Sequence, residues 1–341
     1  MNKRRDSYLD VFRGIVALWI VVIHVAFHNS FGQPEWLRSF TLLLDVPAFF
    51  FLSGMTRAVV GKEMLIGAVI RLSTTFAFCV LLLMLFNGSP WERKVLVPAK
   101  YLLFSSEKIE GLESFVWSYW FVPCYLVVLL FAEALVARVS RFKYLVGIGL
   151  FLPIPFMFLA RETSGFPVLG VDSRDVFFYL PLFLFGYFIR EKVIFTGLQK
   201  RAAIGCLIAG AVGWGLCALF LGEDAFQLQA KKFPAQLPYV CASMISVSAI
   251  IFFYRDLSGR FRLLEHVGRN AIYYYCGQAF ATSLMRDHVT PYVNLAAENW
   301  VGRFVILVPI GLLITVGFSE VLRYLLDQVV ALIRRAHPEA R

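Results

Sequence analysis

The chain has 341 residues, of which 59% are hydrophobic and only 16% are charged, and its mean hydropathy is +0.69. A soluble globular domain usually carries about 25% charged residues, so this composition excludes an ordinary soluble enzyme and indicates an integral membrane protein. The net charge of +10 would suggest a nucleic-acid partner in a soluble protein. Here the basic residues fall between apolar segments, so we interpret the charge as membrane topology and expect no nucleic-acid partner.

Apolar segments of membrane-spanning length follow one another along the chain. A helix that crosses ~30 Å of hydrocarbon needs about 20 largely apolar residues. Ten segments meet this requirement approximately, at 9–29, 39–60, 65–86, 117–137, 143–160, 175–191, 202–221, 237–254, 268–285 and 302–326. The predicted fold class is therefore all-α, a polytopic membrane protein with a single bundle of about ten transmembrane helices.

The distribution of basic residues predicts the orientation of this bundle. With the N-terminus inside, the segments assigned to the cytoplasm hold about twice as many Lys and Arg residues as those assigned to the outside. Both termini are therefore predicted to be cytoplasmic. The longest stretch between spans, residues 87–116, is assigned to the outside, and no soluble domain is expected. Residues 1–341 are thus predicted to form one transmembrane domain.

The first segment, YLDVFRGIVALWIVVIHVAFH (residues 8–28), carries ionisable side chains that a membrane helix usually avoids. Arg13 and His24 are eleven residues apart, which in an α-helix gives a rise of ~16 Å and places both side chains on nearly the same face. The Arg13 cation would then lie at the cytoplasmic end of the first span. An imidazole, which titrates near pH ~6.5, would lie about halfway across the membrane.

Each of these residues also has a structural interpretation. Asp10 lies three residues before Arg13 and can pair with it at the helix end. His24 can be a hydrogen-bond partner between helices or a general base that accepts a hydroxyl proton. His28 lies four residues after His24, but no third ligand is evident nearby in the sequence, and none of the six cysteines forms a Cys-x-x-Cys pair. We therefore predict no metal site and no disulfide framework.

Polar residues near the later segments are candidates for substrate binding. The segment DVPAFFFLSGM (45–55) places Asp45 at the outer end of the second span, and Arg57, Lys62 and Arg71 lie on the cytoplasmic side. These cations suit phosphate groups, although positive-inside anchoring alone would also explain them.

Two further motifs and one ion pair complete the set of polar candidates. SYWFVPCY (118–125) contributes Trp120, and GRNAIYYYCGQAF (268–280) contributes Asn270 at its start and Gln278 near mid-membrane. Glu320 and Arg323 are three residues apart in the last segment, and we predict a structural ion pair between them.

These segments together carry a resemblance to a known family. LDVFRGIVALWIVVIH, VPAFFFLSGM, the W-F-V-P and FLFGYFIR segments and GRNAIYYYCGQAF look like the membrane acyltransferase type 3 family, over nearly the whole chain. Within that family, the fucose 4-O-acetylase-like branch of polysaccharide O-acetyltransferases is the most similar. The resemblance implies a ten-helix bundle in a bacterial cytoplasmic (inner) membrane. It also implies transfer of an acyl group, usually acetyl from cytoplasmic acetyl-CoA, to a hydroxyl of an extracytoplasmic glycan.

The resemblance also implies roles for individual residues. The essential first-span histidine of the family corresponds to His24, its first-span arginine to Arg13, and its basic position after the second span to Arg71. We therefore predict that His24 is the general base. The residues expected to bind acetyl-CoA are Asp10, Arg13 and Arg71, and those expected to bind the acceptor are Asp45, Trp120, Asn270 and Gln278. The family commonly carries His near the position of Gln278 and Ser after Asn270, and this chain departs from it at both places.

The expected partners are an acyl-CoA, a glycan or lipid-linked saccharide acceptor, and the lipid bilayer. The sequence leaves open the identity of the glycan, succinyl or another acyl group in place of acetyl, an acyl-enzyme intermediate, and the oligomeric state. The alternative function is a transporter or flippase of a glycan precursor, which would equally explain charges inside the membrane. That alternative predicts internal repeats with interrupted helices, and none is evident in the sequence.

Overall fold

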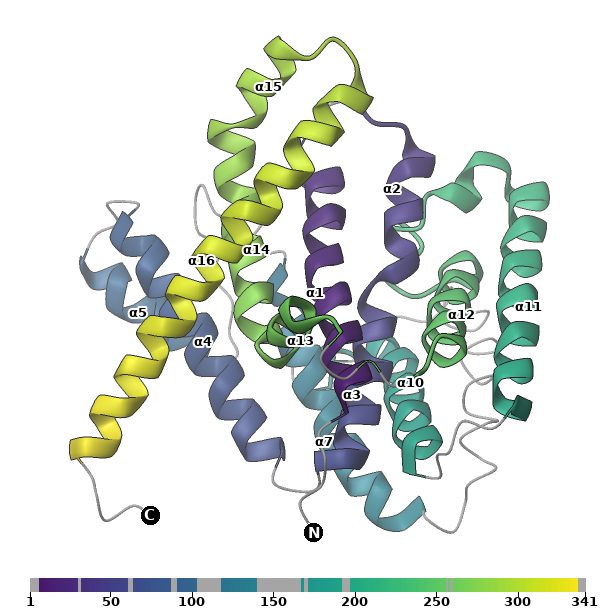
Figure 1. Ribbon diagram of the computed structural model, residues 1–341, viewed down its shortest axis with the longest axis horizontal. Coiled ribbons are helices and arrows are strands. Elements are labelled where there is room, and N and C mark those ends of the chain that lie inside the picture. The colour runs from purple at the N-terminus through teal and green to yellow at the C-terminus, as the bar shows by residue number, and fades with distance from the viewer. Residues whose placement is uncertain are drawn as a thin grey trace. The chain divides into compact units, whose positions relative to one another are not determined.

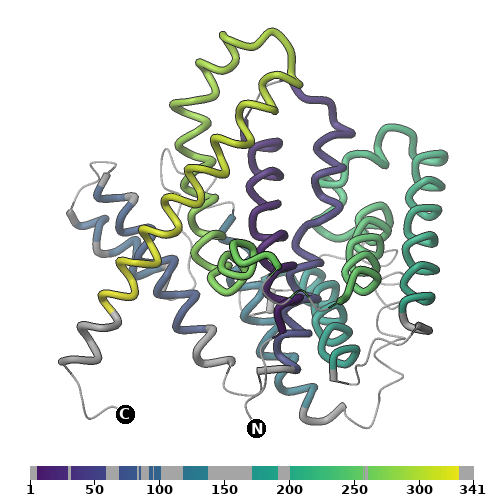
Figure 2. Tube along the Cα trace, in the orientation of Figure 1, coloured from purple at the N-terminus to yellow at the C-terminus, as the bar shows by residue number. Residues whose placement is uncertain are grey.

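A computed structural model describes residues 6–29, 32–60, 64–86, 91–102, 118–139, 167–168, 171–191, 197–255, 257 and 260–336, which include all the coloured segments of Figure 2. Within these residues the fold is all-helical apart from one antiparallel pair of two-residue strands, β1 (Pro167–Val168) and β2 (Val171–Asp172). The predicted all-α architecture is confirmed to this extent.

The longer helices occupy most of the predicted apolar segments (Figure 1). They are α1 (Ser7–His28), α3 (Val46–Val60), α4 (Met64–Phe86), α7 (Phe121–Val139), α10 (Ser173–Glu191), α11 (Gly197–Leu221), α12 (Leu237–Phe252), α14 (Ala271–His288) and α16 (Trp300–Ala336). The predicted segment 143–160 lies outside the described residues. The shorter elements are α2 (Glu35–Thr41), α5 (Trp91–Leu102), α13 (Arg262–Arg269), α15 (Thr290–Ala296) and the 3₁₀ helices η1 (Leu42–Leu44) and η2 (Gly222–Phe226).

Four helical stretches in the described residues are long and apolar enough to cross a membrane: Ser7–His28, Glu35–Ala58, Lys200–Phe226 and Trp300–Val329. The last two expose most of their apolar surface, since only 11% and 28% of their most apolar windows are buried. Large exposed apolar faces are unfavourable in water, so hydrocarbon is the solvent that suits them. The chain is therefore a multi-pass membrane protein, while the count of about ten spans and the cytoplasmic termini stay predictions.

The helices divide into two compact units. The first unit comprises residues 1–19, 33–67 and 121–269, and the second comprises residues 20–32, 68–120 and 270–341. Helix α1 is continuous from Ser7 to His28, so its first half belongs to the first unit and its second half to the second.

Glycines bring helix backbones into contact within the first unit. A Cβ added at Gly54 of α3 would lie 1.9 Å from the carbonyl oxygen of Phe183 in α10, and one added at Gly186 of α10 would lie 2.0 Å from the carbonyl oxygen of Phe51 in α3. The same reciprocal arrangement joins α1 to α13 at Gly14 and Gly268. Small residues allow this approach between membrane helices. The crossing of α1 with α13 fixes the part of α1 that carries Asp10.

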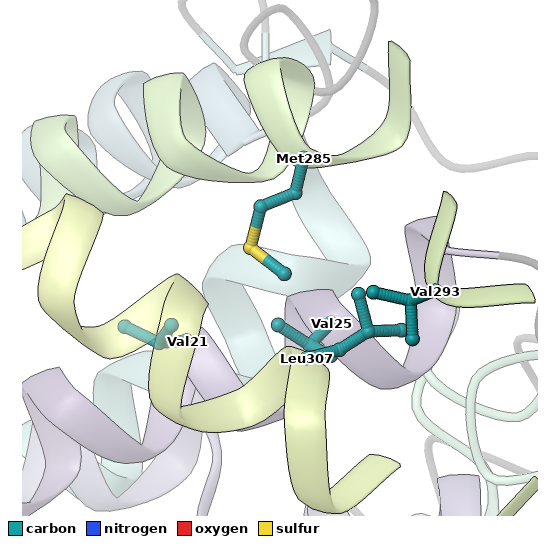
Figure 3. Close-up of a cluster of buried hydrophobic side chains, with 5 residues drawn as sticks. All are labelled: Val21, Val25, Met285, Val293 and Leu307. Atoms are coloured by element: carbon teal, nitrogen blue, oxygen red, sulfur yellow. The ribbon is translucent and has the colours of Figure 1, made fainter. Parts of the chain in front are cut away.

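In the second unit, α14 and α16 lie side by side (Figure 1) and enclose an apolar cluster with the second half of α1. Figure 3 shows this cluster, whose buried members are Val21, Val25, Met285, Val293 and Leu307. The Met285 side chain extends from α14 into the cluster (Figure 3). This packing holds the half of α1 that carries His24 against α14.

Replacing Gly186 with Ala is expected to lower the free energy of unfolding by about 1–3 kcal/mol, the usual cost of overpacking. The added methyl would lie far inside van der Waals contact with the α3 backbone. Thermal unfolding of the protein in detergent should show a lower Tm.

Gly205→Ala is the matched control, because nothing lies within 4 Å of a Cβ at this position of α11. Its Tm should stay constant or rise, since alanine is the better helix former. Equal Tm changes in the two variants would contradict the close α3–α10 crossing.

Candidate functional site

A chain of polar side chains surrounds His24 in the second unit. His24 is half-buried near the end of α1, and its Nδ1 lies 3.5 Å from Oγ of Ser118, just before α7. Nε2 of Gln278 in α14 lies 3.5 Å from the same Oγ. Ser118 is 2% exposed and Gln278 is fully buried. The imidazole thus turns one nitrogen toward a dry polar group, and its ring geometry directs Nε2 away from Ser118.

Tyr275 and aromatic packing hold Ser118 in place. The Tyr275 hydroxyl donates a 2.7 Å hydrogen bond to the backbone oxygen of Ser118. Tyr275 precedes Gln278 by three residues, so both project from one face of α14. The Phe76 ring of α4 contacts Tyr119 and Tyr275, with ring centroids 5.2 and 6.0 Å apart. Aromatic side chains therefore surround the polar chain and exclude water from it.

His28 lies next to His24, with ring centroids 5.0 Å apart. The spacing of four residues places both rings on one face of α1. In the described part of the chain, no three His, Cys, Asp or Glu side chains come together in a way that could hold a metal ion. A histidine side chain at this position can take part in proton transfer and hydrogen bonding.

The other charged residues of α1 lie in the first unit. Asp10 is 4% exposed and accepts a 3.0 Å hydrogen bond from Nε of Arg269, whose Nη2 binds Glu265 at 3.0 Å. Arg13 is half-buried, and its guanidinium interacts electrostatically with the Tyr125 side chain of α7. Arg269 thus adds a cation beside Asp10 that the sequence did not reveal.

Asp45 belongs to a separate buried network in the first unit. Its Oδ2 accepts hydrogen bonds from Nζ of Lys232 at 2.6 Å and from the Tyr239 hydroxyl at 2.9 Å. Asp45 and Lys232 are 3% and 5% exposed. Lys232 lies in the connection between α11 and α12, so the pair ties this connection to the start of α3. Asp45 acts here as the anchor of a buried ion pair.

The cations expected at the cytoplasmic mouth differ in their surroundings. Arg57 is 4% exposed and forms a two-pronged ion pair with Glu133 of α7, which neutralises its charge. The interpretation of Arg57 as part of a phosphate-binding mouth is therefore wrong. Arg71 of α4 is exposed in the second unit, and its guanidinium interacts electrostatically with the Tyr273 side chain of α14. The Arg71 side chain is therefore accessible to a phosphate group. Lys62, the third of these cations, lies outside the described residues.

Trp120 and Asn270 lie at turns. Trp120 is half-buried in the turn before α7, two residues after Ser118. Asn270 is the N-cap residue of α14 and makes no side-chain capping hydrogen bond. Of the predicted site residues, the structure brings His24 and Gln278 together through Ser118. The predicted ion pair of Glu320 and Arg323 is confirmed, at 2.8 Å.

Sequence reasoning missed Ser118, Tyr275, Lys232, Tyr239 and Arg269. Ser118 is 94 positions from His24 and Lys232 is 187 positions from Asp45. Ser118 stands inside the aromatic motif SYWFVPCY, but a single serine beside aromatic residues carries no distinguishing spacing. Lys232 resembled any topology-setting basic residue of an outer loop. Only the tertiary contacts single out these side chains.

A family model described as an acyltransferase domain matches residues 6–320, from the start of α1 into α16. No curated protein and no solved structure matches the chain at a significant level.

Replacing Lys232 with Met is expected to lower the free energy of unfolding by about 3–5 kcal/mol, because it leaves the buried Asp45 charge without its cation. Combining Lys232→Met with Asp45→Asn removes both charges and should recover much of this loss. Denaturant unfolding in detergent measures each variant.

The neighbouring Lys231 offers a matched control, because it is less buried and its contacts in this turn are made by its backbone. Lys231→Met should leave the unfolding midpoint near that of the parent protein. A double variant no more stable than Lys232→Met alone would contradict the assignment of Asp45 to this ion pair.

Proposed function

Because the chain belongs to the acyltransferase type 3 family of membrane acyltransferases, we propose that it moves an acetyl group from cytoplasmic acetyl-CoA to a hydroxyl of an extracytoplasmic or lipid-linked glycan. The family and the exposed apolar helices make the chain a membrane acyltransferase. The acetyl donor, the glycan acceptor, the catalytic base and a location in the bacterial inner membrane are parts of this proposal. So is membership of the fucose 4-O-acetylase-like branch.

The observation that carries the proposal is the environment of His24. A general base must offer an unprotonated lone pair near neutral pH. Imidazole can do this as an uncharged group, without a counter-ion. His24 is half-buried, so a substrate can approach one side of the ring while Ser118 lies against Nδ1. Nε2 is the nitrogen that we propose as the base.

The reaction that we propose is a direct transfer. The hydroxyl oxygen of the acceptor attacks the thioester carbonyl carbon, and its proton passes to Nε2 of His24. The tetrahedral intermediate then collapses, the carbon–sulfur bond breaks, and the CoA thiolate leaves. His24 returns its proton to that thiolate, which regenerates the neutral base. No acyl-histidine forms in this sequence.

For the acyl donor we propose that Arg13 and Arg71 bind the CoA phosphates and that Asp10 positions Arg13. The continuity of α1 supports the role of Arg13, because eleven residues of α-helix separate it from His24 by ~16 Å. An extended pantetheine arm can cover a distance of this order. The exposure of Arg71 supports its role, since a phosphate must reach the guanidinium.

For the acceptor we propose that Trp120, Asn270 and Gln278 contact the glycan or the reacting groups. Trp120 is half-buried beside the Ser118 turn, Asn270 is half-buried at the start of α14, and Gln278 is fully buried on the same helix next to Ser118. For Asp45 we propose an indirect role, because its Oδ2 already accepts hydrogen bonds from Lys232 and Tyr239. Asp45 would then act by holding the α11–α12 connection against the start of α3.

His24→Ala is expected to abolish acetyl transfer, with a loss of at least about 100-fold in rate, the usual contribution of a general base. The assay follows acetyl transfer from radiolabelled acetyl-CoA to membrane glycans, with mass spectrometry of the glycan to identify the acyl group. His288→Ala, an exposed histidine at the end of α14, is the control and should keep parental activity. An active His24→Ala protein would overturn the base assignment.

Arg13→Ala is expected to weaken binding of radiolabelled acetyl-CoA to the detergent-solubilised protein about tenfold or more, the effect of losing one charge-assisted phosphate contact. Arg38→Ala provides the control, because Arg38 pairs on α2 with Glu35 at 3.2 Å. Its affinity should stay unchanged. Wild-type protein that binds no acetyl-CoA and transports a glycan precursor would favour the flippase alternative.

A further inference from the structure

The segment that follows α12 in the first unit is rich in arginine. This arginine-rich segment, residues 252–269 (FFYRDLSGRFRLLEHVGR), holds four arginines and two acids. One acid, Glu265, is 8% exposed and accepts a 3.0 Å hydrogen bond from Arg269, while Asp256 lies outside the described residues. The charge that the segment presents is positive even when Asp256 is counted. The other arginines, all exposed, are Arg255, Arg260 and Arg262.

Large apolar side chains are exposed between these arginines. Phe261 is 41% exposed and Leu263 is 68% exposed, and they alternate with Arg260 and Arg262 along the chain. Phe253, near the start of the segment, is 57% exposed. Such a surface is unfavourable in water because of its apolar side chains, and unfavourable in hydrocarbon because of its charges. The boundary between lipid headgroups and acyl chains suits both kinds of side chain.

Helix α13, which forms the second half of the segment, lies near one surface of the membrane. Helix α1 has 22 residues, a length of ~33 Å that matches the hydrocarbon thickness, so its first turns lie near that surface. There α13 crosses α1 (Figure 1), because a Cβ added at Gly268 would lie 1.7 Å from the carbonyl oxygen of Asp10. The exposed face of α13 is therefore at the depth of the headgroups.

We propose that the arginine-rich segment is a binding surface for the headgroups of anionic phospholipids. Arg255, Arg260 and Arg262 bind the headgroup phosphate, since a guanidinium can donate two parallel hydrogen bonds to phosphate oxygens. Phe261 and Leu263 enter the layer of acyl chains. A lipid with a net negative charge is favoured because a zwitterionic headgroup carries a cation that these arginines repel. This inference does not depend on the acyl-transfer chemistry.

Both ends of the segment are fastened to the start of α1. The Tyr254 hydroxyl donates a 2.7 Å hydrogen bond to Asp6, which also accepts a 3.0 Å hydrogen bond from the backbone N–H of Tyr8 in the first turn of α1. At the other end, Nε of Arg269 donates to Asp10 at 3.0 Å. A lipid bound between these two attachments therefore restrains the part of α1 that carries Asp10.

The charge of the surface is tested with Arg260→Gln combined with Arg262→Gln. Native mass spectrometry of the detergent-solubilised full chain measures binding of phosphatidylglycerol, with phosphatidylcholine as the zwitterionic comparison. The parent should bind phosphatidylglycerol more tightly. The double variant should lose about 30-fold in this affinity, from about fivefold per arginine near a membrane surface, and should bind phosphatidylcholine much as the parent does. Parental affinity for phosphatidylglycerol would overturn the proposal.

Lys200→Gln combined with Arg201→Gln is the matched control. It removes the same charge from the first turn of α11, where Arg201 is exposed. Its affinity for phosphatidylglycerol should stay at the parental value. Equal losses in the two double variants would mean that any cation near a helix end suffices, and would overturn the assignment to the arginine-rich segment.

The apolar part of the surface is tested separately with Leu263→Ser. Its affinity for both lipids should fall about tenfold, the lower end of the effect of burying a leucine side chain. Because Leu263 is exposed in the protein, the Tm in detergent should not change. Parental affinity for both lipids would overturn the insertion of Leu263 among the acyl chains.

Acetyl-CoA also carries phosphates, so the lipid titration is repeated in its presence. Bound phosphatidylglycerol should be retained, and its displacement by acetyl-CoA would place these arginines in a donor site and overturn the lipid surface. Amide hydrogen exchange of α13 and the first turns of α1 should be slower in nanodiscs of phosphatidylglycerol than in nanodiscs of phosphatidylcholine. Equal exchange would overturn the restraint on α1. None of these measurements needs acetyl transfer, so their failure and that of the proposed function are distinguishable.

Discussion

Charged groups inside an apolar bundle must be paired, and the fold depends on this constraint. An isolated ion in hydrocarbon is very costly, and removal of one partner from a buried pair leaves that cost uncompensated. In the first unit, Arg269 lies beside Asp10, Lys232 beside Asp45, and Glu133 beside Arg57. Each pair joins segments that are far apart in the chain. The pairs therefore determine which helices are neighbours, in addition to neutralising charge.

The surroundings of His24 follow a different rule. Its polar neighbours, Ser118 and Gln278, are neutral, their contacts are long, and one amide oxygen has no partner among the described residues. Protein interiors normally satisfy such groups, and the exceptions concentrate where a substrate completes the hydrogen bonding. The second unit thus holds a buried polar site with aromatic neighbours, which is where we propose that the acyl transfer takes place.

The sequence predicts what depends on neighbours in the chain. The apolar segments, the helical state and the ion pair of Glu320 with Arg323 are local properties, and the structure agrees with them. Contacts between residues that are far apart in the sequence leave no recognisable spacing pattern in it. Arg57 resembled an anchoring or phosphate-binding cation until the fold placed Glu133 beside it. Ser118 could not be told from other serines near aromatic residues, because its importance arises only where α14 and the end of α1 meet it.

The same pairing rule explains why a histidine suits the role of base that we propose for His24. Asp10, Asp45 and Glu133 each have a cationic partner in this structure, and a cation beside a carboxylate makes it a weaker base. A carboxylate freed of its cation would take up a proton inside the bundle and lose its lone pair for catalysis. A neutral imidazole needs no counter-ion, and it gains a charge only while the proton is in transit. His24 can therefore stay both unionised and basic in surroundings where the carboxylates cannot.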